Sequence, residues 1–263
     1  RSVGPFVFWD HFGPVTLPAG RNMDVRPHPH IGLATVTWLF EGRIRHRDSL
    51  GSVQDITPGA VNWMTAGRGI VHSERTPEAD RGRDNPLHGL QIWLGLPEEH
   101  EEHEPEFHHH PAGSLPVVDL DGVRFDLIAG EALGSASPVR VFSPLAYLAA
   151  SLEPGQSFRW PRQYSEQAVY VVEGQLRIDG AEVPAHRMAV LPDRAQVAVE
   201  SAGGARIALL AGEPLGHRYL WWNFVSSRRE RIREAADLWR QGGFDRVAGD
   251  EEFIPLPEDR PMP

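Results

Sequence analysis

The stretch RPHPHIGLATVTWLFEGRIRHRDSLGSVQDITPGAVNWMTAGRGIVHSE, residues 26–74, has the pattern of short strands joined by tight turns. Residues 33–40 alternate in polarity and are rich in β-branched and aromatic side chains, which favours a β-strand. The dipeptides Glu41-Gly42 and Pro58-Gly59 mark turns beside such runs. The chain of 263 residues has 26 glycines and 23 prolines, so turns are frequent throughout. We therefore predict an all-β fold.

Four potential metal ligands lie near the two ends of this stretch. His28 and His30 are two residues apart, and so are His72 and Glu74. Successive side chains of a strand point to opposite faces, so the members of each pair share a face. The proline before each of the first two histidines suits an extended backbone. If the two segments are neighbours in a barrel, we expect the four side chains to bind one metal ion.

The donor types indicate which ions would bind. Three imidazole nitrogens and one carboxylate oxygen suit one divalent transition metal such as Fe, Ni, Cu, Mn, Co or Zn, whereas Ca and Mg prefer oxygen ligands. Four protein ligands leave positions open on an octahedral ion, which is typical of a catalytic site. A lone His-x-His pair often lies on a polar strand face instead. The prediction therefore depends on the second pair.

The other histidines are interpreted as structural. His11 follows an aromatic strand-like run and is expected to be a buried or capping residue. His46 lies in an arginine-rich strand and is expected to be exposed or structural, not a ligand. Residues 97–111 are acidic and rich in histidine, and we predict a solvated loop there because no apolar framework would fix ligand geometry.

Composition excludes several kinds of protein. The net charge of −10 and the pI of about 5.7 argue against binding nucleic acid or an anionic membrane through bulk charge. The chain has no cysteine, so disulfides, thiol nucleophiles and iron–sulfur clusters are excluded. It also has no lysine, which excludes Schiff-base chemistry on that side chain. Without a membrane-length apolar run or a signal-peptide pattern, we expect a cytoplasmic protein. We also expect it to be a monomer.

The second half of the sequence repeats the first in weaker form. Residues 172–177 resemble residues 40–45 at an offset of 132, and a later Pro-containing turn gives an offset of 126. We expect an N-terminal barrel domain with the metal at 1–133, and a degenerate barrel domain at 134–263 that includes a C-terminal helix and tail. At these offsets the four predicted ligands correspond to Trp160, Arg162, Ala198 and Glu200.

A helix is predicted near the C-terminus. The sequence Ser-Arg-Arg-Glu at 227–230 is a capping box, and apolar residues follow at helical spacing before Gly242-Gly243. We expect about 14 helical residues. The apolar stripe is expected to pack on a barrel, with partner binding as the alternative. Residues 250–263 are acidic and proline-rich and are expected to form an extended tail.

Several motifs occur in a fixed order: GPFVFWDHFGP at 4–14, HPHIG at 28–32, EG at 41–42, HRDSLG at 46–51 and PGAVNWMTAGRGIVHSE at 58–74. Together they resemble the pirin family of the cupin superfamily, and the resemblance is weaker after Gly130. It implies a bicupin, with two antiparallel, jelly-roll-like β-barrels and the metal in the N-terminal one. The metal-binding motif of the family maps onto His28, His30, His72 and Glu74.

The resemblance also implies two functions. Bacterial members are quercetin 2,3-dioxygenases, so we expect a dioxygenase that cleaves a small aromatic, flavonol-like substrate with O₂. Glu74 would then be a ligand and the general base that takes the substrate's hydroxyl proton. Eukaryotic members are iron-associated co-regulators of transcription, which favours iron and gives the alternative of a non-enzymatic redox sensor that acts through a protein partner. A purely structural metal is the third interpretation.

Overall fold

The structure is a computed structural model that describes residues 2–259 and 261–263. Strands dominate, and α1 (Arg229–Arg240) is the one α-helix in this described part of the chain. The prediction of an all-β fold with a C-terminal helix is therefore confirmed. No helix among the described residues is both long and apolar enough to cross a membrane.

The chain forms two compact units. The N-terminal barrel unit comprises Phe8–Ala112 and Leu215–Pro263. The C-terminal barrel unit comprises Gly113–Pro214 and the segment that ends at Val7. This division differs from the expected domains 1–133 and 134–263, because the helix and tail belong to the unit that contains the histidine motifs.

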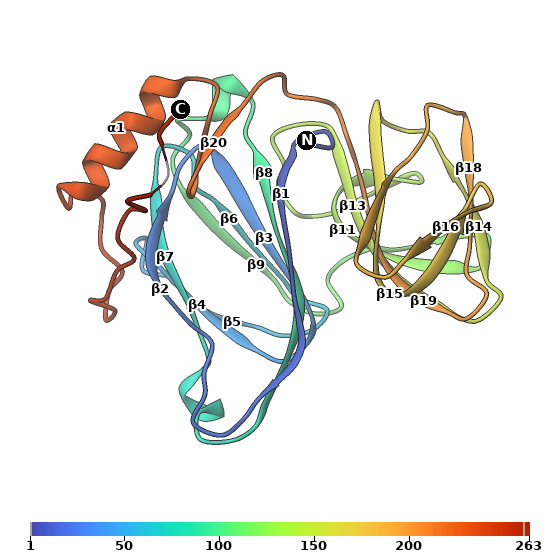
Figure 1. Ribbon diagram of the computed structural model, residues 1–263, viewed down its shortest axis with the longest axis horizontal. Coiled ribbons are helices and arrows are strands. Elements are labelled where there is room, and N and C mark those ends of the chain that lie inside the picture. Colours follow the sequence, from blue (N-terminus) through green and yellow to red (C-terminus); the bar gives the residue numbers. More distant parts are fainter. Residues whose placement is uncertain (1, 260) are drawn as a thin grey trace. The chain divides into compact units, whose positions relative to one another are not determined.

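Two antiparallel sheets face each other in the N-terminal barrel unit (Figure 1). One has the order β1 (Phe6–Leu17), β8 (Asn85–Gly95), β3 (Leu33–Glu41), β6 (Val61–Thr65) and β9 (Glu106–His110). The other has the order β2 (Asp24–His30), β7 (Ile70–Arg75), β4 (Ile44–Asp48) and β5 (Val53–Ile56). The short 3-10 helices η1 (Glu78–Asp80) and η2 (Glu98–His100) lie in loops.

Strand β9 corrects the prediction of a loop over residues 97–111. Its five residues pair with β6, and Nδ1 of His109 lies 2.7 Å from the amide oxygen of Asn62. The backbone of β6 therefore supplies a pairing partner that local polarity does not reveal.

The C-terminal barrel unit is a second antiparallel barrel with an apolar interior. Its main sheet has the order β10 (Val117–Leu120), β11 (Val123–Ala132), β13 (Leu145–Leu152), β19 (Ala205–Gly212), β15 (Glu166–Ile178), β18 (Gln196–Glu200) and β14 (Ser157–Pro161). Strand β12 (Ser135–Ala136) pairs with β11, and β16 (Ala181–Pro184) and β17 (Arg187–Val190) pair with β15. The buried rings of Phe125, Phe158 and Trp160 fill its core.

The register of the second barrel corrects one predicted correspondence. Trp160 lies opposite Val197 on the neighbouring strand, whereas His28 lies opposite His72 in the first barrel. Trp160 and the predicted Ala198 are therefore not directly opposite each other, so the correspondences predicted for His28 and His72 cannot both hold. Strand pairing fixes this register, and the spacing from a turn does not.

A C-terminal segment completes the N-terminal barrel unit. It contains the hairpin of β20 (Tyr219–Trp221) and β21 (Phe224–Ser226), followed by α1. The apolar stripe of α1 packs on Ile31 and on the aromatic side chains of the hairpin. The cluster consists of Ile31, Trp221, Phe224, Ile232, Ala235 and Ala236, all buried. This packing confirms that the helix covers a barrel.

A buried carboxylate anchors the same segment. Glu101 accepts hydrogen bonds from the hydroxyl of Ser226 at 2.8 Å and from the backbone N–H of Ser227 at 2.7 Å, and it pairs with Arg218 at 3.0 Å. Ser227 is therefore occupied by Glu101 and does not cap the helix. The N-cap is Arg228, with no side-chain hydrogen bond, so the capping-box prediction is wrong. The helix has 12 residues, close to the 14 expected.

Gly32 provides a test of how closely this segment must approach the barrel. Its φ is +66°, and an added Cβ would lie 1.9 Å from the carbonyl oxygen of Val225. We expect Gly32→Ala to lower the free energy of unfolding by at least about 3 kcal/mol, because it combines left-handed strain with a backbone clash. The control is Gly20→Ala, with φ +85° and no atom within 4 Å, which should cost only about 1 kcal/mol. Urea denaturation measures both, and equal losses would contradict the close approach.

Candidate metal centre

Strands β2 and β7 bring three of the predicted ligands together. His28 is paired with His72, and His30 is paired with Ile70. A bulge between Val25 and His28 shifts the register locally. One nitrogen from each of His28, His30 and His72 lies within 4.8 Å of the other two, and all three residues are buried. The spacing argument therefore identified a real cluster.

The outer nitrogen of each ring has a partner. Nδ1 of His28 lies 2.8 Å from the carbonyl oxygen of Arg26, and Nδ1 of His30 lies 3.1 Å from that of Asn223. A carbonyl only accepts, so these two rings donate from Nδ1, and their neutral forms leave Nε2 with a free lone pair. Nδ1 of His72 lies 3.4 Å from Nδ1 of His46.

The inner nitrogens fit a cation between them. Nε2 of His30 and Nε2 of His72 are 3.1 Å apart. In one tautomer of His72 its Nε2 donates a hydrogen bond to His30, and in the other tautomer both nitrogens present lone pairs that a shared cation can bind. Adjacent ligands on an octahedral ion, each about 2.1 Å from the metal, would be about 3.0 Å apart. The cluster therefore has the donor chemistry and the spacing of a transition-metal site.

Burial keeps the three imidazoles neutral. Desolvation lowers the pKa of His28 to about 4. The pKa values of His30 and His72 are also well below the ordinary value, first because of burial and second because of the neighbouring histidines. Neutral imidazole is the form that binds a metal, so the cluster is ready to bind one at neutral pH.

Glu74 is buried near this cluster but is not one of the three residues whose ligand atoms lie within 4.8 Å of one another. Its Oε1 accepts a hydrogen bond of 2.7 Å from Nε2 of Gln91. Burial raises the pKa of the Glu74 carboxyl, and the hydrogen bond from Gln91 opposes that rise. A buried carboxyl with a raised pKa can accept and hold a proton.

Sequence reasoning missed the role of His46. It is 4% exposed, so the exposed alternative is wrong and the structural one holds. Its Nε2 lies 2.8 Å from Oδ2 of Asp48, and its ring stacks on Phe107 with centroids 4.2 Å apart. The sequence signal was the alternation of His46 and Asp48 with arginines, and in the structure His46 and Asp48 are buried while Arg45 and Arg47 are only partly buried.

Aromatic side chains lie beside the cluster. The ring of Trp93 is 5.1 Å from His30 in an edge-on arrangement, and it packs on Phe8 at 4.2 Å. These residues give the N-terminal barrel an apolar surface near the histidine cluster. His11 is separate from the cluster and pairs with His88, their Nε2 atoms being 2.8 Å apart.

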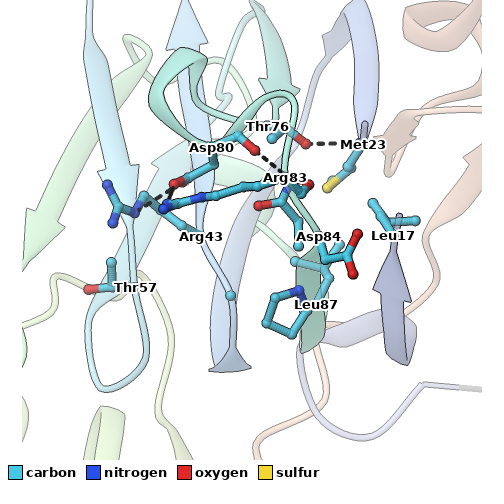
Figure 2. Close-up of a pocket in the computed structure, with 12 residues that line it drawn as sticks. Leu17, Met23, Arg43, Thr57, Thr76, Asp80, Arg83, Asp84 and Leu87 are labelled. Carbon is cyan, nitrogen blue, oxygen red and sulfur yellow. Dashed lines mark hydrogen bonds and ion pairs between the residues drawn. The ribbon is translucent and has the colours of Figure 1, made fainter. Parts of the chain in front are cut away.

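A cavity of about 340 Å³ in the same unit contains none of the predicted ligands (Figure 2). Figure 2 shows Asp80 between Arg43 and Arg83, both of which pair with it. The hydroxyl of Thr76 accepts a hydrogen bond of 2.9 Å from the N–H of Met23 on its border. Asp80 is occupied by both arginines and none of the predicted ligands lines this cavity, so we assign the chemistry to the histidine cluster.

The burial of His28 predicts a pH dependence of stability for protein stripped of metal. The folded pKa of about 4 is below the unfolded value of 6.5, so only the unfolded state gains a proton as the pH falls between these values. We expect His28 alone to reduce the free energy of unfolding by about 2 kcal/mol between pH 7 and pH 5. Urea denaturation with a chelator present measures this, and His28→Asn should remove that part of the slope. An unchanged slope would contradict the assignment.

Comparison with known proteins finds relatives over most of the chain. The family described as Pirin matches residues 1–94, and the Pirin C-terminal cupin domain matches residues 147–245. A "Pirin-like protein" from Caulobacter vibrioides is 47% identical over 262 residues, which are 98% of this chain and 91% of the relative. A "Putative quercetin 2,3-dioxygenase" from Pseudomonas aeruginosa is 38% identical over 92% of this chain and 76% of the relative.

One solved structure matches this chain over nearly its whole length. The crystal structure of quercetin 2,3-dioxygenase from Acinetobacter baumannii matches with a TM-score of 0.89 and 38% sequence identity. The match covers 99% of this chain and 88% of that chain. Both barrel units described above therefore have counterparts in a solved relative.

Proposed function

Because this chain belongs to the pirin family, we propose that it is a metal-dependent dioxygenase that cleaves flavonol-like substrates. The observation that carries the proposal is the meeting of three neutral imidazoles near a buried carboxylate in the N-terminal barrel. The relatives named as quercetin 2,3-dioxygenases support the substrate class. We further propose that His28, His30, His72 and Glu74 hold the ion.

Each side chain has a defined part in the proposed reaction. A bound divalent ion would supply Lewis-acid and one-electron chemistry next to the three histidines. Glu74 takes the proton of the substrate's hydroxyl group, and Gln91 holds its carboxylate in place at 2.7 Å. Trp93 and the Phe8 ring that packs on it offer the planar rings an apolar surface beside the histidines. Overall, one O₂ is consumed and one carbon monoxide is released for each substrate cleaved.

The three-histidine donor set is compatible with several metals. We propose iron as the native ion, while Ni, Cu, Mn, Co and Zn suit the same ligands. Metal analysis of protein purified without a histidine tag identifies the ion that is bound.

Aerobic assay of quercetin tests the proposed activity. Protein loaded in turn with Fe, Ni, Cu, Mn and Co should consume the flavonol and release carbon monoxide with at least one ion, and chelation should stop the reaction. If none of these ions gives turnover above free metal, the proposed activity is rejected.

A second candidate is a redox-sensing regulator without enzymatic activity. One contact favours it: the carbonyl of Asn223, on the turn of the C-terminal hairpin, accepts the hydrogen bond from His30. A change at the metal could therefore alter the hairpin and the helix that packs on it, where a protein partner would bind. Pull-down with the reduced and oxidised metal separates the two functions, and equal capture in both states rejects the sensor.

A further inference from the structure

His72 differs from the other two histidines of the cluster in its outer partner. His28 and His30 each meet a backbone carbonyl, whereas His72 meets the imidazole of His46, which in turn meets the carboxylate of Asp48. We propose that Asp48 and His46 form a relay of positioning residues that orients the His72 ring and keeps its Nε2 free for the metal.

The hydrogen bonds of the relay have one order that suits a metal. If Nε2 of His72 binds an ion, its hydrogen is on Nδ1 and is donated to Nδ1 of His46. The hydrogen of the neutral His46 ring is then on Nε2, where it is donated to Oδ2 of Asp48 at 2.8 Å. The carboxylate at one end therefore determines the tautomer of the ligand at the other end.

The relay is built rigidly. Asp48 is 1% exposed, and its other oxygen, Oδ1, accepts the backbone N–H groups of Leu50 at 2.9 Å and Ser52 at 3.0 Å. Only Oδ2 is directed to His46. The ring of His46 lies nearly parallel to that of Phe107, with 12° between their planes. Strand pairing holds the two ends of the relay close together, since Asp48 lies directly opposite His72 on the neighbouring strand.

The arrangement has two consequences for the metal. It fixes the ring plane of His72, and the negative charge of Asp48 increases the basicity of that ligand through His46. Outer partners of this kind typically contribute ten- to a hundredfold to metal affinity. The inference depends on the proposed function only in that an ion occupies the cluster.

Asp48→Asn is the sharpest test because it reverses the polarity of the relay. The asparagine oxygen can retain both backbone hydrogen bonds, while its NH₂ group faces Nε2 of His46. That nitrogen must now accept, so the hydrogen of His46 moves to Nδ1 and meets the Nδ1–H of His72. We expect the affinity for Zn²⁺, measured by competition with a chelator, to fall ten- to a hundredfold. The ¹⁵N shifts of the Zn²⁺-loaded protein should show the changed tautomer of His46.

Two further variants complete the test. Asp55→Asn is the matched control on the neighbouring strand, where the carboxylate pairs with Arg45, and it should leave Zn²⁺ affinity unchanged. If Asp48→Asn fails to fold, His46→Phe keeps the stacking ring, removes both nitrogens and should show the same loss. A Zn²⁺ affinity of Asp48→Asn or His46→Phe equal to that of the wild type, or an unchanged His46 tautomer in Asp48→Asn, would overturn the relay alone. A wild type that binds no Zn²⁺, Ni²⁺ or Fe²⁺ would overturn the metal centre and the relay together.

Discussion

Replacing His30 with asparagine should lower metal affinity by at least about a hundredfold. Zinc sites with four ligands bind with about 10–16 kcal/mol, so one lost ligand costs about 3 kcal/mol. His30 also lies 3.1 Å from His72 at the inner nitrogens, so its loss opens one side of the cluster. Titration with Ni²⁺ in the presence of a competing chelator measures the change.

The control for this variant is His11→Asn. His11 is a histidine of the same barrel unit that pairs with His88 away from the cluster. It should keep full affinity and one equivalent of metal. If His30→Asn binds Ni²⁺ as tightly as the wild type, the cluster is not the metal site, and the proposed oxygen chemistry loses its basis.

Glu74→Gln should lower turnover of the flavonol by about 10²- to 10⁴-fold at saturating metal, which is the usual contribution of a general base. The substitution keeps the size of the side chain and a hydrogen-bonding partner for Gln91. It removes the group that takes the substrate's proton. Because Glu74 is also proposed as a ligand, we expect metal affinity to fall by about tenfold as well.

Glu104→Gln is the matched control, since that carboxylate is 73% exposed and pairs with Arg68. It should leave turnover unchanged. Full turnover by Glu74→Gln would rule out the proposed base. A normal metal affinity combined with lost turnover would keep Glu74 as the base and remove it from the ligand set.

The sequence predicted those parts of the site that depend on local periodicity. Residues two apart share a strand face, and this rule predicted that His28 and His30 lie together, whereas adding His72 required the assumption that the two segments are neighbours. The same rule applied to His46 and Asp48 would have placed both inside the barrel, because arginines alternate with them. The arginines beside them instead suggest an exposed strand, and this obscures the period.

Other features could not be read from the sequence because they depend on distant segments. The carbonyl that bonds His30 is 193 residues away, on a turn that no periodicity links to it. Ser227 has the pattern of a helix cap, yet the buried Glu101 binds it instead. Strand β9 forms in an acidic stretch because β6 supplies its pairing partner. In each case a tertiary contact prevailed over a local preference.

The position of the C-terminal hairpin in the chain determines when, during synthesis, the Asn223 carbonyl becomes available to His30. A ribosome that has reached Ala112 has already added the three histidines of the cluster. Asn223, whose carbonyl bonds His30, is added only after the whole of Gly113–Pro214. At about 5–20 residues per second, that delay is roughly 5–20 s. Until Asn223 has been made, the His30 ring of a nascent chain lacks the carbonyl partner that it has in the folded protein.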